Sequence, residues 1–226
     1  MRCRLPLSAP GDLDCLAAGA GHLDGEPLRF QSVFKAARNG GREKAVLSAV
    51  PSATILRPSV VFGPEDQFTN RFAALAQMSP ALPLIGGGAT RLQPVYVGDV
   101  ATAVADAVDG KTKAGATYEL GGPEVMTMRE IMEIILATIE RHRMLVSLPF
   151  GLAKLQALFL QFAPGPLKLT PDQVELLRSD NVVSQAAKAA GLTLEGLGIA
   201  PDSLEAIAPQ YLWRFRKAGQ FAHKGA

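Results

Sequence analysis

Glycines are the first residues in this chain whose spacing could do chemistry, because a glycine-rich loop can hold the phosphates of a nucleotide. Residues 18–25 read AGAGHLDG. Such a loop needs an apolar strand directly before it and a helix directly after it. Residues 12–15 (DLDC) make a poor buried strand, and Glu26-Pro27 makes a poor helix start. We therefore predict a flexible segment here rather than a cofactor loop.

A second glycine cluster, Gly86–Gly88, follows a short apolar run, LPLI. It could form a phosphate cradle or a simple turn, and its composition alone leaves both open. Asp99 follows another short apolar run, VYV. A carboxylate there can accept backbone N–H bonds at the start of a helix over residues 101–108, and its charge suits the positive end of that helix.

The elements that must position these residues centre on residues 53–64 (ATILRPSVVFGP). Their β-branched and aromatic side chains predict a buried strand, which Pro58 interrupts or bends. Gly63-Pro64 ends the run and predicts a loop.

Two stretches carry a family resemblance. They are LRPSVVFGPEDQF, followed by Asn70 and Phe72, and QPVYVGDVA about thirty residues later. Together they resemble the second half of the extended and atypical short-chain dehydrogenases/reductases. Within that family they are most similar to the complex I alpha-subcomplex subunit 9 accessory proteins and their bacterial relatives, which are often labelled NAD-dependent epimerase/dehydratase-like. The resemblance covers roughly residues 43–215, and it is more specific for the family than for an activity.

The resemblance implies an α/β fold, in which a parallel NAD(P)-binding Rossmann sheet is followed by a small, mostly helical C-terminal domain. Family members carry their glycine loop in the first βα unit, and the 52 residues before the strand leave little room for it. We therefore expect the N-terminal half of the Rossmann fold to be missing. Residues 1–42 are expected to be disordered or non-native, through a frame-shifted or mis-started translation. Residues 43–125 would be the Rossmann remnant, and residues 126–226 a substrate-side or docking domain.

Active family members place a lysine four residues after a catalytic tyrosine, so that both side chains share one face of a helix. At the corresponding place this chain offers Phe34 and Arg38. Phenylalanine has no proton to give, so no catalytic residue is predicted.

The resemblance also implies binding residues. The loop formed by Pro58, Ser59, Val60 and Val61 would touch the nicotinamide ring of the cofactor. Arg91 would pair with a substrate phosphate, although a solvated surface arginine is the alternative. The resemblance further favours a hairpin-like turn at the second glycine cluster.

Composition excludes several classes of protein. With 226 residues, 48% hydrophobic and 19% charged, the chain is globular rather than disordered. The net charge of +2 gives no argument for a nucleic-acid partner. Cys3 and Cys15 have no metal-site spacing, so no metal is predicted. The sequence contains no run of eighteen apolar residues, so no transmembrane helix is predicted.

Local signals predict helices in the C-terminal part. Residues 127–130 (TMRE) form a capping box, and residues 170–173 (TPDQ) form a second helix start with proline in the first turn. The helix after the first box has an isoleucine stripe that predicts core packing. We also expect helices over residues 67–77 and 201–212 and a strand over residues 144–148.

Residues 150–162 stand apart, because Lys154 is their only charge. This segment is too short to span a bilayer, and it either packs in the small domain or beds into a membrane surface or partner. Residues 211–217 (YLWRFRK) combine aromatic and cationic side chains. They suit an anionic lipid surface or an acidic partner, with a solvated terminus as the alternative.

Two functions follow from these observations. The first is an NAD(P)-binding accessory protein of the complex I type with a structural or assembly role, peripheral on the cytoplasmic face of the inner membrane. The second is an epimerase/dehydratase or oxidoreductase acting on a nucleotide-sugar or similar carbonyl substrate. NAD or NADP serves the full-length family, and we expect weak or absent binding by this chain. Lack of the tyrosine–lysine pair favours the first function.

Overall fold

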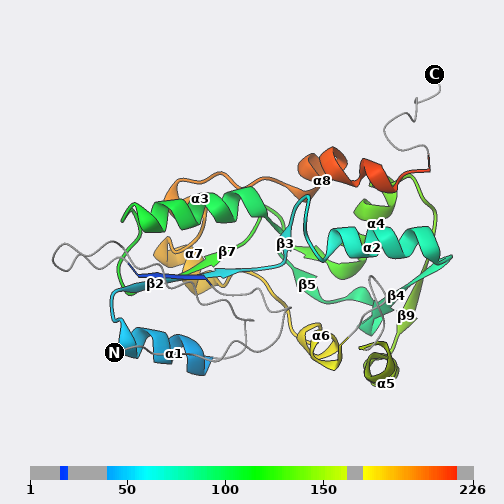
Figure 1. The fold of residues 1–226 in the computed structure, drawn as a ribbon, viewed down its shortest axis with the longest axis horizontal. Coiled ribbons are helices and arrows are strands. Elements are labelled where there is room, and N and C mark those ends of the chain that lie inside the picture. Colours follow the sequence, from blue (N-terminus) through cyan, green and yellow to red (C-terminus); the bar gives the residue numbers. More distant parts are fainter. Residues whose placement is uncertain (1–15, 20–39, 162–169, 218–226) are drawn as a thin grey trace.

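The computed structural model describes residues 16–19, 40–161 and 170–217. Several predictions made above lie outside the described residues: those for Phe34, Arg38, Cys3 and Cys15, most of the first glycine cluster, and the end of the apolar segment at Phe162. The described chain forms two lobes, a sheet lobe and a helical lobe (Figure 1).

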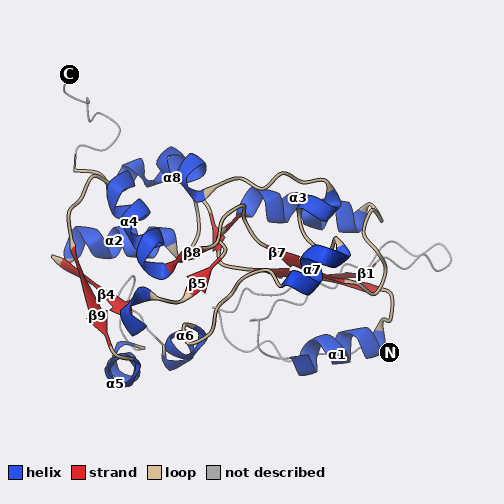
Figure 2. Cartoon of the chain, turned by 180° about the vertical axis from the view of Figure 1, so that it is seen from behind, coloured by secondary structure: helices blue, strands red, loops and turns tan. Residues whose placement is uncertain are grey.

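The sheet lobe is built on strand β2 (Ala53–Pro58), which pairs in parallel with β7 (Thr117–Leu120). Strand β1 (Leu16–Gly19) pairs antiparallel with the other edge of β2. Helix α3 (Val97–Val108) covers one face of this sheet, and α1 (Gly40–Ala49) covers the other (Figures 1 and 2). Parallel strands need cover on both faces, and the helices provide it.

The helical lobe packs α2 (Thr69–Met78), α4 (Met128–Thr138) and α8 (Leu204–Leu212) together. These helices cover one face of a parallel pair of strands, β4 (Ala81–Ile85) and β9 (Met144–Leu148). The core includes three isoleucines of the predicted stripe, all fully buried: Ile131, Ile135 and Ile139.

Short elements join the lobes. Strand β3 (Val61–Phe62) pairs in parallel with β6 (Val95–Tyr96), and β5 (Arg91–Leu92) pairs antiparallel with β8 (Met126–Thr127). The remaining elements are η1 (Gly86–Gly88), α5 (Phe150–Leu160), α6 (Pro171–Leu176), α7 (Gln185–Ala190), η3 (Glu195–Leu197) and η4 (Trp213–Phe215).

The predicted capping box at Thr127 and the predicted helix start at Thr170 are both confirmed, and the second start is also a capping box. Thr127 accepts from the backbone N–H of Glu130, whose side chain accepts from Thr127 in return. Thr170 and Gln173 do the same at the start of α6, with Pro171 in the first turn. These signals are local, which is why they could be found in the sequence.

The predicted cap at Asp99 is wrong. Helix α3 begins at Val97, so Asp99 lies inside its first turn, and Tyr96 is the cap residue without a side-chain hydrogen bond. Asp99 is buried, and its carboxylate accepts a hydrogen bond from the backbone N–H of Asp202 at 2.9 Å. Burial raises the pKa of Asp99, although this backbone hydrogen bond opposes the shift. The carboxylate therefore ties α3 to the segment that leads into α8.

The second glycine cluster is a turn, as the resemblance favoured. Gly86, Gly87 and Gly88 have φ angles of 62°, 74° and 73°, which residues with a Cβ rarely adopt. A Cβ on Gly86 would also lie 2.4 Å from the Phe150 ring. The glycines therefore let the first turn of α5 approach the end of β4.

Candidate functional site

The predicted cofactor residues lie where β2 ends. Pro58 is the last residue of β2 and pairs with Leu120, and Ser59 donates its backbone N–H to the carbonyl of Leu120 at 2.8 Å. Val60 packs against the core of the helical lobe, while Val61 packs against the core of the sheet lobe. The chain therefore crosses from the sheet lobe to the helical lobe at residues 58–61, and we call these four residues the passage.

The polar groups of this passage are bonded within the chain. The Ser59 hydroxyl donates to the carbonyl of Asn181 at 2.7 Å and accepts from the backbone N–H of Gln93 at 3.3 Å. The carbonyl of Val60 accepts from the backbone N–H of Val95 at 2.9 Å. The Ser59 hydroxyl donor is therefore already used by the Asn181 carbonyl. Contact with nicotinamide through Pro58–Val61 stays a prediction.

Gln93 is the residue that the sequence analysis missed. It is buried, its side-chain Nε2 donates to the carbonyl of Gly122 at 2.7 Å, and its Oε1 accepts from the backbone N–H of Val183 at 2.9 Å. An amide directly before the apolar run PVYV was the available signal, since a buried amide needs both kinds of partner.

Arg91 lies close to this site through Asp180 and Asn181. Its backbone N–H donates to Asp180 Oδ1 at 2.9 Å, and its carbonyl accepts from the backbone N–H of Asn181 at 2.9 Å. Ser59 also bonds to Asn181, so the structure brings both predicted residues to one segment. The Arg91 side chain is exposed, and its guanidinium has no partner among the described residues. A substrate phosphate at Arg91 stays a prediction.

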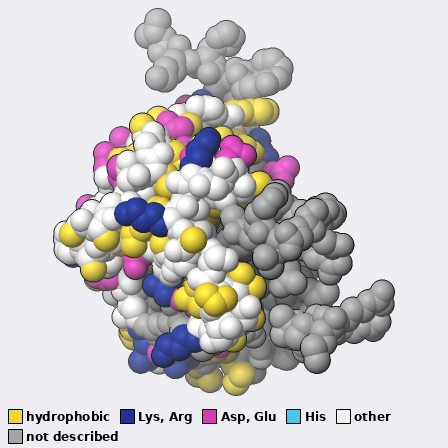
Figure 3. Space-filling model, turned by 90° about the vertical axis from the view of Figure 1, so that its left-hand side faces the viewer, with side chains coloured by type: hydrophobic (Ala, Val, Ile, Leu, Met, Phe, Trp, Pro, Cys, Tyr) yellow, Lys and Arg dark blue, Asp and Glu magenta, His cyan; other side chains and the backbone are white. Residues whose placement is uncertain are grey.

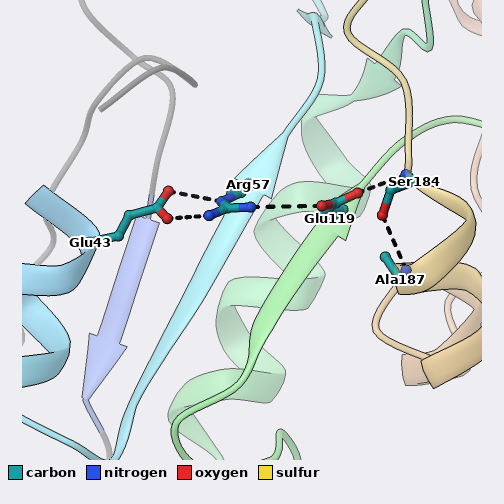
Figure 4. A network of polar contacts seen from close by, with 5 residues as sticks. All are labelled: Glu43, Arg57, Glu119, Ser184 and Ala187. Carbon is teal, nitrogen blue, oxygen red and sulfur yellow. Dashed lines mark hydrogen bonds and ion pairs between the residues drawn. The ribbon is translucent and has the colours of Figure 1, made fainter. Parts of the chain in front are cut away.

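A second network crosses the sheet below the site (Figure 4). Arg57 on β2 forms a two-point contact with Glu43 of α1 and lies 3.7 Å from Glu119 Oε1 on β7. Glu119 Oε2 accepts from the backbone N–H of Ser184 at 2.7 Å, and Ser184 caps α7 through the backbone N–H of Ala187. This network ties both α1 and α7 to the β2–β7 pair.

Metal ligands do not gather in the described part of the chain, where no group of three or more histidines, cysteines, aspartates or glutamates could hold an ion. In the same residues, no helix is long and apolar enough to cross a membrane.

Comparison with known proteins decides the family. No family model matches the chain. NADH dehydrogenase [ubiquinone] 1 alpha subcomplex subunit 9 of Arabidopsis thaliana is 39% identical over 186 residues, which are 78% of this chain and 45% of the relative. The mouse protein of the same name is 32% identical over 177 residues, 77% of this chain and 45% of the relative. The chain is a homologue of the subunit 9 proteins. It spans about half the length of these curated relatives.

The fold agrees with this relationship. The dTDP-glucose 4,6-dehydratase of Bacillus anthracis, solved in complex with NAD, superposes with a TM-score of 0.52 over 89% of this chain and 59% of that chain, at 14% identity. The chain therefore shares the Rossmann-like fold of this dehydratase, as the resemblance implied.

The basic tail, residues 211–217, makes contacts within the chain, and its suitability for an anionic surface or acidic partner stays a prediction. The Arg214 guanidinium donates to the carbonyl of Pro64 and to Asn70 Oδ1, both at 2.7 Å. Arg216 donates to the carbonyl of Thr138 at 2.9 Å and lies 3.5 Å from Glu140. Both arginines therefore bond residues 214–216 to the helical lobe.

Helix α5 has an unusual orientation for a helix in water. Its Ala153 and Ala157 are fully buried, while Leu152, Leu155 and Leu158 are 57%, 57% and 53% exposed. A helix of a soluble protein normally buries its large apolar side chains. The exposed leucine row is therefore an apolar patch on the surface of the described chain.

The neighbouring strands extend this apolar surface. Side chains alternate between the two faces of a sheet. Leu82, Leu84 and Leu145 point into the helical core, whereas Ile85 and Leu148 pack on the opposite face against α5. The same face carries two β9 residues with exposed side chains, Met144 (67%) and Val146 (50%). We call Met144, Val146, Leu152, Leu155 and Leu158 the aliphatic surface.

Proposed function

We propose that this chain is an accessory protein of a complex I (NADH:ubiquinone oxidoreductase) assembly, with a structural role rather than turnover. The observation that carries the proposal is the 39% identity over 186 residues to a protein named as an alpha-subcomplex subunit of this enzyme. The aliphatic surface supports it, because an accessory protein needs a face for its neighbours.

Lack of turnover is supported by the tyrosines. The residues four positions after Tyr96, Tyr118 and Tyr211 are Val100, Gly122 and Phe215, so no tyrosine–lysine pair of the family spacing exists. The Tyr211 hydroxyl is bonded to the hydroxyl of Thr69, and burial raises the pKa of Tyr211 far above its ordinary value. It is poorly suited to exchange a proton near neutral pH.

Weak cofactor binding is part of the proposal. The donor of Ser59 is spent on Asn181, and the first glycine cluster is followed in the sequence by Glu26-Pro27, a poor helix start, although strand β1 (Leu16–Gly19) leads into it. Calorimetric titration of the purified chain with NADH and NADPH should show no tight binding. A dissociation constant in the low micromolar range, about −8 kcal/mol, would contradict this part.

In this proposal, the aliphatic surface within residues 126–217 is the part of the chain that contacts a partner. Burial of each exposed leucine would contribute on the order of 1.5–3 kcal/mol, before the cost of ordering both partners is subtracted. The face shown in Figure 3 contrasts with this surface, because lysine, arginine and acidic side chains are interspersed over it. We propose that the aliphatic surface seats the chain on a membrane-bound assembly, peripheral on the cytoplasmic face of the inner membrane.

Co-purification tests the assembly role. A tagged full-length chain, produced in its host and extracted in mild detergent, should migrate on native gels with NADH:ubiquinone oxidoreductase activity. The double variant Leu155→Asp, Leu158→Asp should lose this association and keep its melting temperature. Val125→Asp, at an apolar residue 38% exposed elsewhere on the chain, is the matched control and should associate normally. A parent chain that migrates alone would overturn the proposal.

The second candidate is an epimerase/dehydratase or oxidoreductase that acts on a nucleotide-sugar or similar carbonyl compound. It is supported by the fold likeness to the Bacillus anthracis dehydratase alone. Turnover of nucleotide-sugars with added NAD(H) or NADP(H), lost in Arg91→Ala, would favour it.

A further inference from the structure

Four segments carry the chain between the two lobes at one place. Residues Leu56, Val95 and Leu120 belong to the sheet-lobe core. Phe62, Leu92 and Met126, each close to one of them in sequence, belong to the helical-lobe core. The chain therefore crosses between the cores at residues 57–61, 93–94 and 121–125, and residues 181–183 bring it back toward α7.

Gln93 bonds to all three of the other crossings. Its backbone N–H lies 3.1 Å from the carbonyl of Asn181 and 3.3 Å from the Ser59 hydroxyl. Its side-chain amide bridges the carbonyl of Gly122 and the backbone N–H of Val183. With 4% exposure, the amide has no access to water as a replacement partner.

The residues around the Gln93 side-chain amide are closely packed. A Cβ on Gly121 would lie 2.6 Å from Gln93 Cδ and 2.6 Å from Val183 Cγ2. A Cβ on Gly122 would lie 1.9 Å from the carbonyl oxygen of Pro94. The crossings touch each other directly, so a change in the amide shifts all of them.

We propose that Gln93 is a positioning residue that sets the orientation of the helical lobe relative to the sheet lobe, and with it the geometry of the Pro58–Val61 passage. In open α/β sheets, ligands bind beyond the carboxyl ends of the strands, and β2 ends in this passage. The effect of Gln93 on a bound cofactor rests on the proposed function, whereas its effect on the orientation of the two lobes does not depend on that function.

Gln93→Glu tests this role, because it keeps the shape and changes only the hydrogen bonding. A carboxylate can accept from the Val183 N–H but cannot donate to the Gly122 carbonyl, whereas a protonated carboxyl does both. Burial raises the pKa of a carboxyl group, so protonation should occur in a mildly acidic range. At neutral pH we expect amide exchange at Val183 and Ser59 to be on the order of tenfold faster than in the parent, and in acid to match the parent measured at the same pH.

Lobe orientation gives the second measurement. Spin labels on the exposed residues Ala101 of α3 and Glu133 of α4, with Cys3 and Cys15 replaced, report the distance between the lobes. Gln93→Glu should broaden this distance at neutral pH and restore the parent distribution in acid. Gln156→Glu, at an exposed glutamine of α5, is the control and should change neither measurement at any pH.

Gln93→Met separates positioning from space filling. It keeps the volume and loses both bonds, so we expect a broad distance and fast exchange at every pH. If both variants match the parent at neutral pH, or if Gln93→Glu shows no recovery in acid, the proposal is wrong. If Gln93→Met does not fold, the acid recovery of Gln93→Glu still decides. No measurement uses a cofactor or partner, so failure here leaves the accessory role untouched.

Discussion

Helices α4 and α5 differ in the burial of their large apolar side chains. Helix α4 buries Ile131 and Ile135 fully and exposes Glu133, whereas α5 buries two alanines and exposes three leucines. The two helices have the same length, 11 residues, and lie in the same lobe. Length and apolar content therefore do not decide which face turns inward. The sequence pattern differs instead: α4 carries a stripe of isoleucines, whereas α5 is apolar on most sides and so exposes large apolar side chains whichever face it buries.

The largest expected effect contrasts one core residue with one surface leucine. Ile135→Ala should lower the free energy of unfolding by about 2–5 kcal/mol, because it opens a cavity between α4 and its neighbours. Leu155→Ala should change it by less than about 0.5 kcal/mol, because the side chain is already in water. Urea unfolding of both variants measures the difference. Equal losses would mean that α5 is ordinary core.

The tail should contribute less than the core. Arg214→Ala removes hydrogen bonds to Pro64 and Asn70, which should cost about 1 kcal/mol because the side chain is exposed. Lys217→Ala is the matched control, because it removes a neighbouring cation without these bonds. Thermal melts of the two variants would show equal stability if the tail were a free, solvated end.

The N-terminal cap of α4 separates the contribution of local hydrogen bonds from that of core packing. Thr127→Ala removes the cap of α4 and should cost about 1 kcal/mol, whereas Thr127→Ser keeps the hydroxyl and should cost little. Urea midpoints measure both. Equal midpoints in the parent and the alanine variant would show that packing of the isoleucine stripe alone sets the start of α4.

The smallest expected effect is a pH dependence of opposite sign at two carboxyl groups. Burial raises the pKa of Asp99, so its ionisation opposes folding, and this contribution to stability falls as pH rises from the ordinary value of 3.8 through the folded pKa. Glu130 accepts hydrogen bonds from Thr127, which lower its pKa, so its contribution is lost as pH falls below 4.5.

Melting temperatures across this range for two variants separate the contributions. Asp99→Asn should flatten the loss of stability with rising pH, and Glu130→Gln should flatten the loss with falling pH. The opposite pH dependence assigned to the two groups would be wrong if Asp99→Asn steepened the loss of stability with rising pH.

Much of the helical lobe could be predicted because its signals are local. The capping boxes at Thr127 and Thr170 and the isoleucine stripe each need only a few consecutive residues. The start of α3 was missed by a few residues because aspartate suits both the cap and the first turn of a helix. That small shift gave Asp99 a different partner.

Other features could not be predicted, because their partners are far away in the chain. Gln93 bonds to residues 29 and 90 positions away, and no local pattern encodes either bond. The outward face of α5 was equally hidden, because a helix that is apolar all round has no periodic signal to orient it. The tail arginines read as free cations until their carbonyl partners on other segments were known.

The glycine turn before β5 has a consequence for how the family can vary. Because Phe150 occupies the space where a Cβ of Gly86 would lie, the residues at these two positions constrain each other sterically. A lineage that gains a side chain at position 86 should carry a small residue at position 150, and its leucine row should rotate or disappear. In relatives, glycine at the first position and an aromatic residue at the second should therefore occur together.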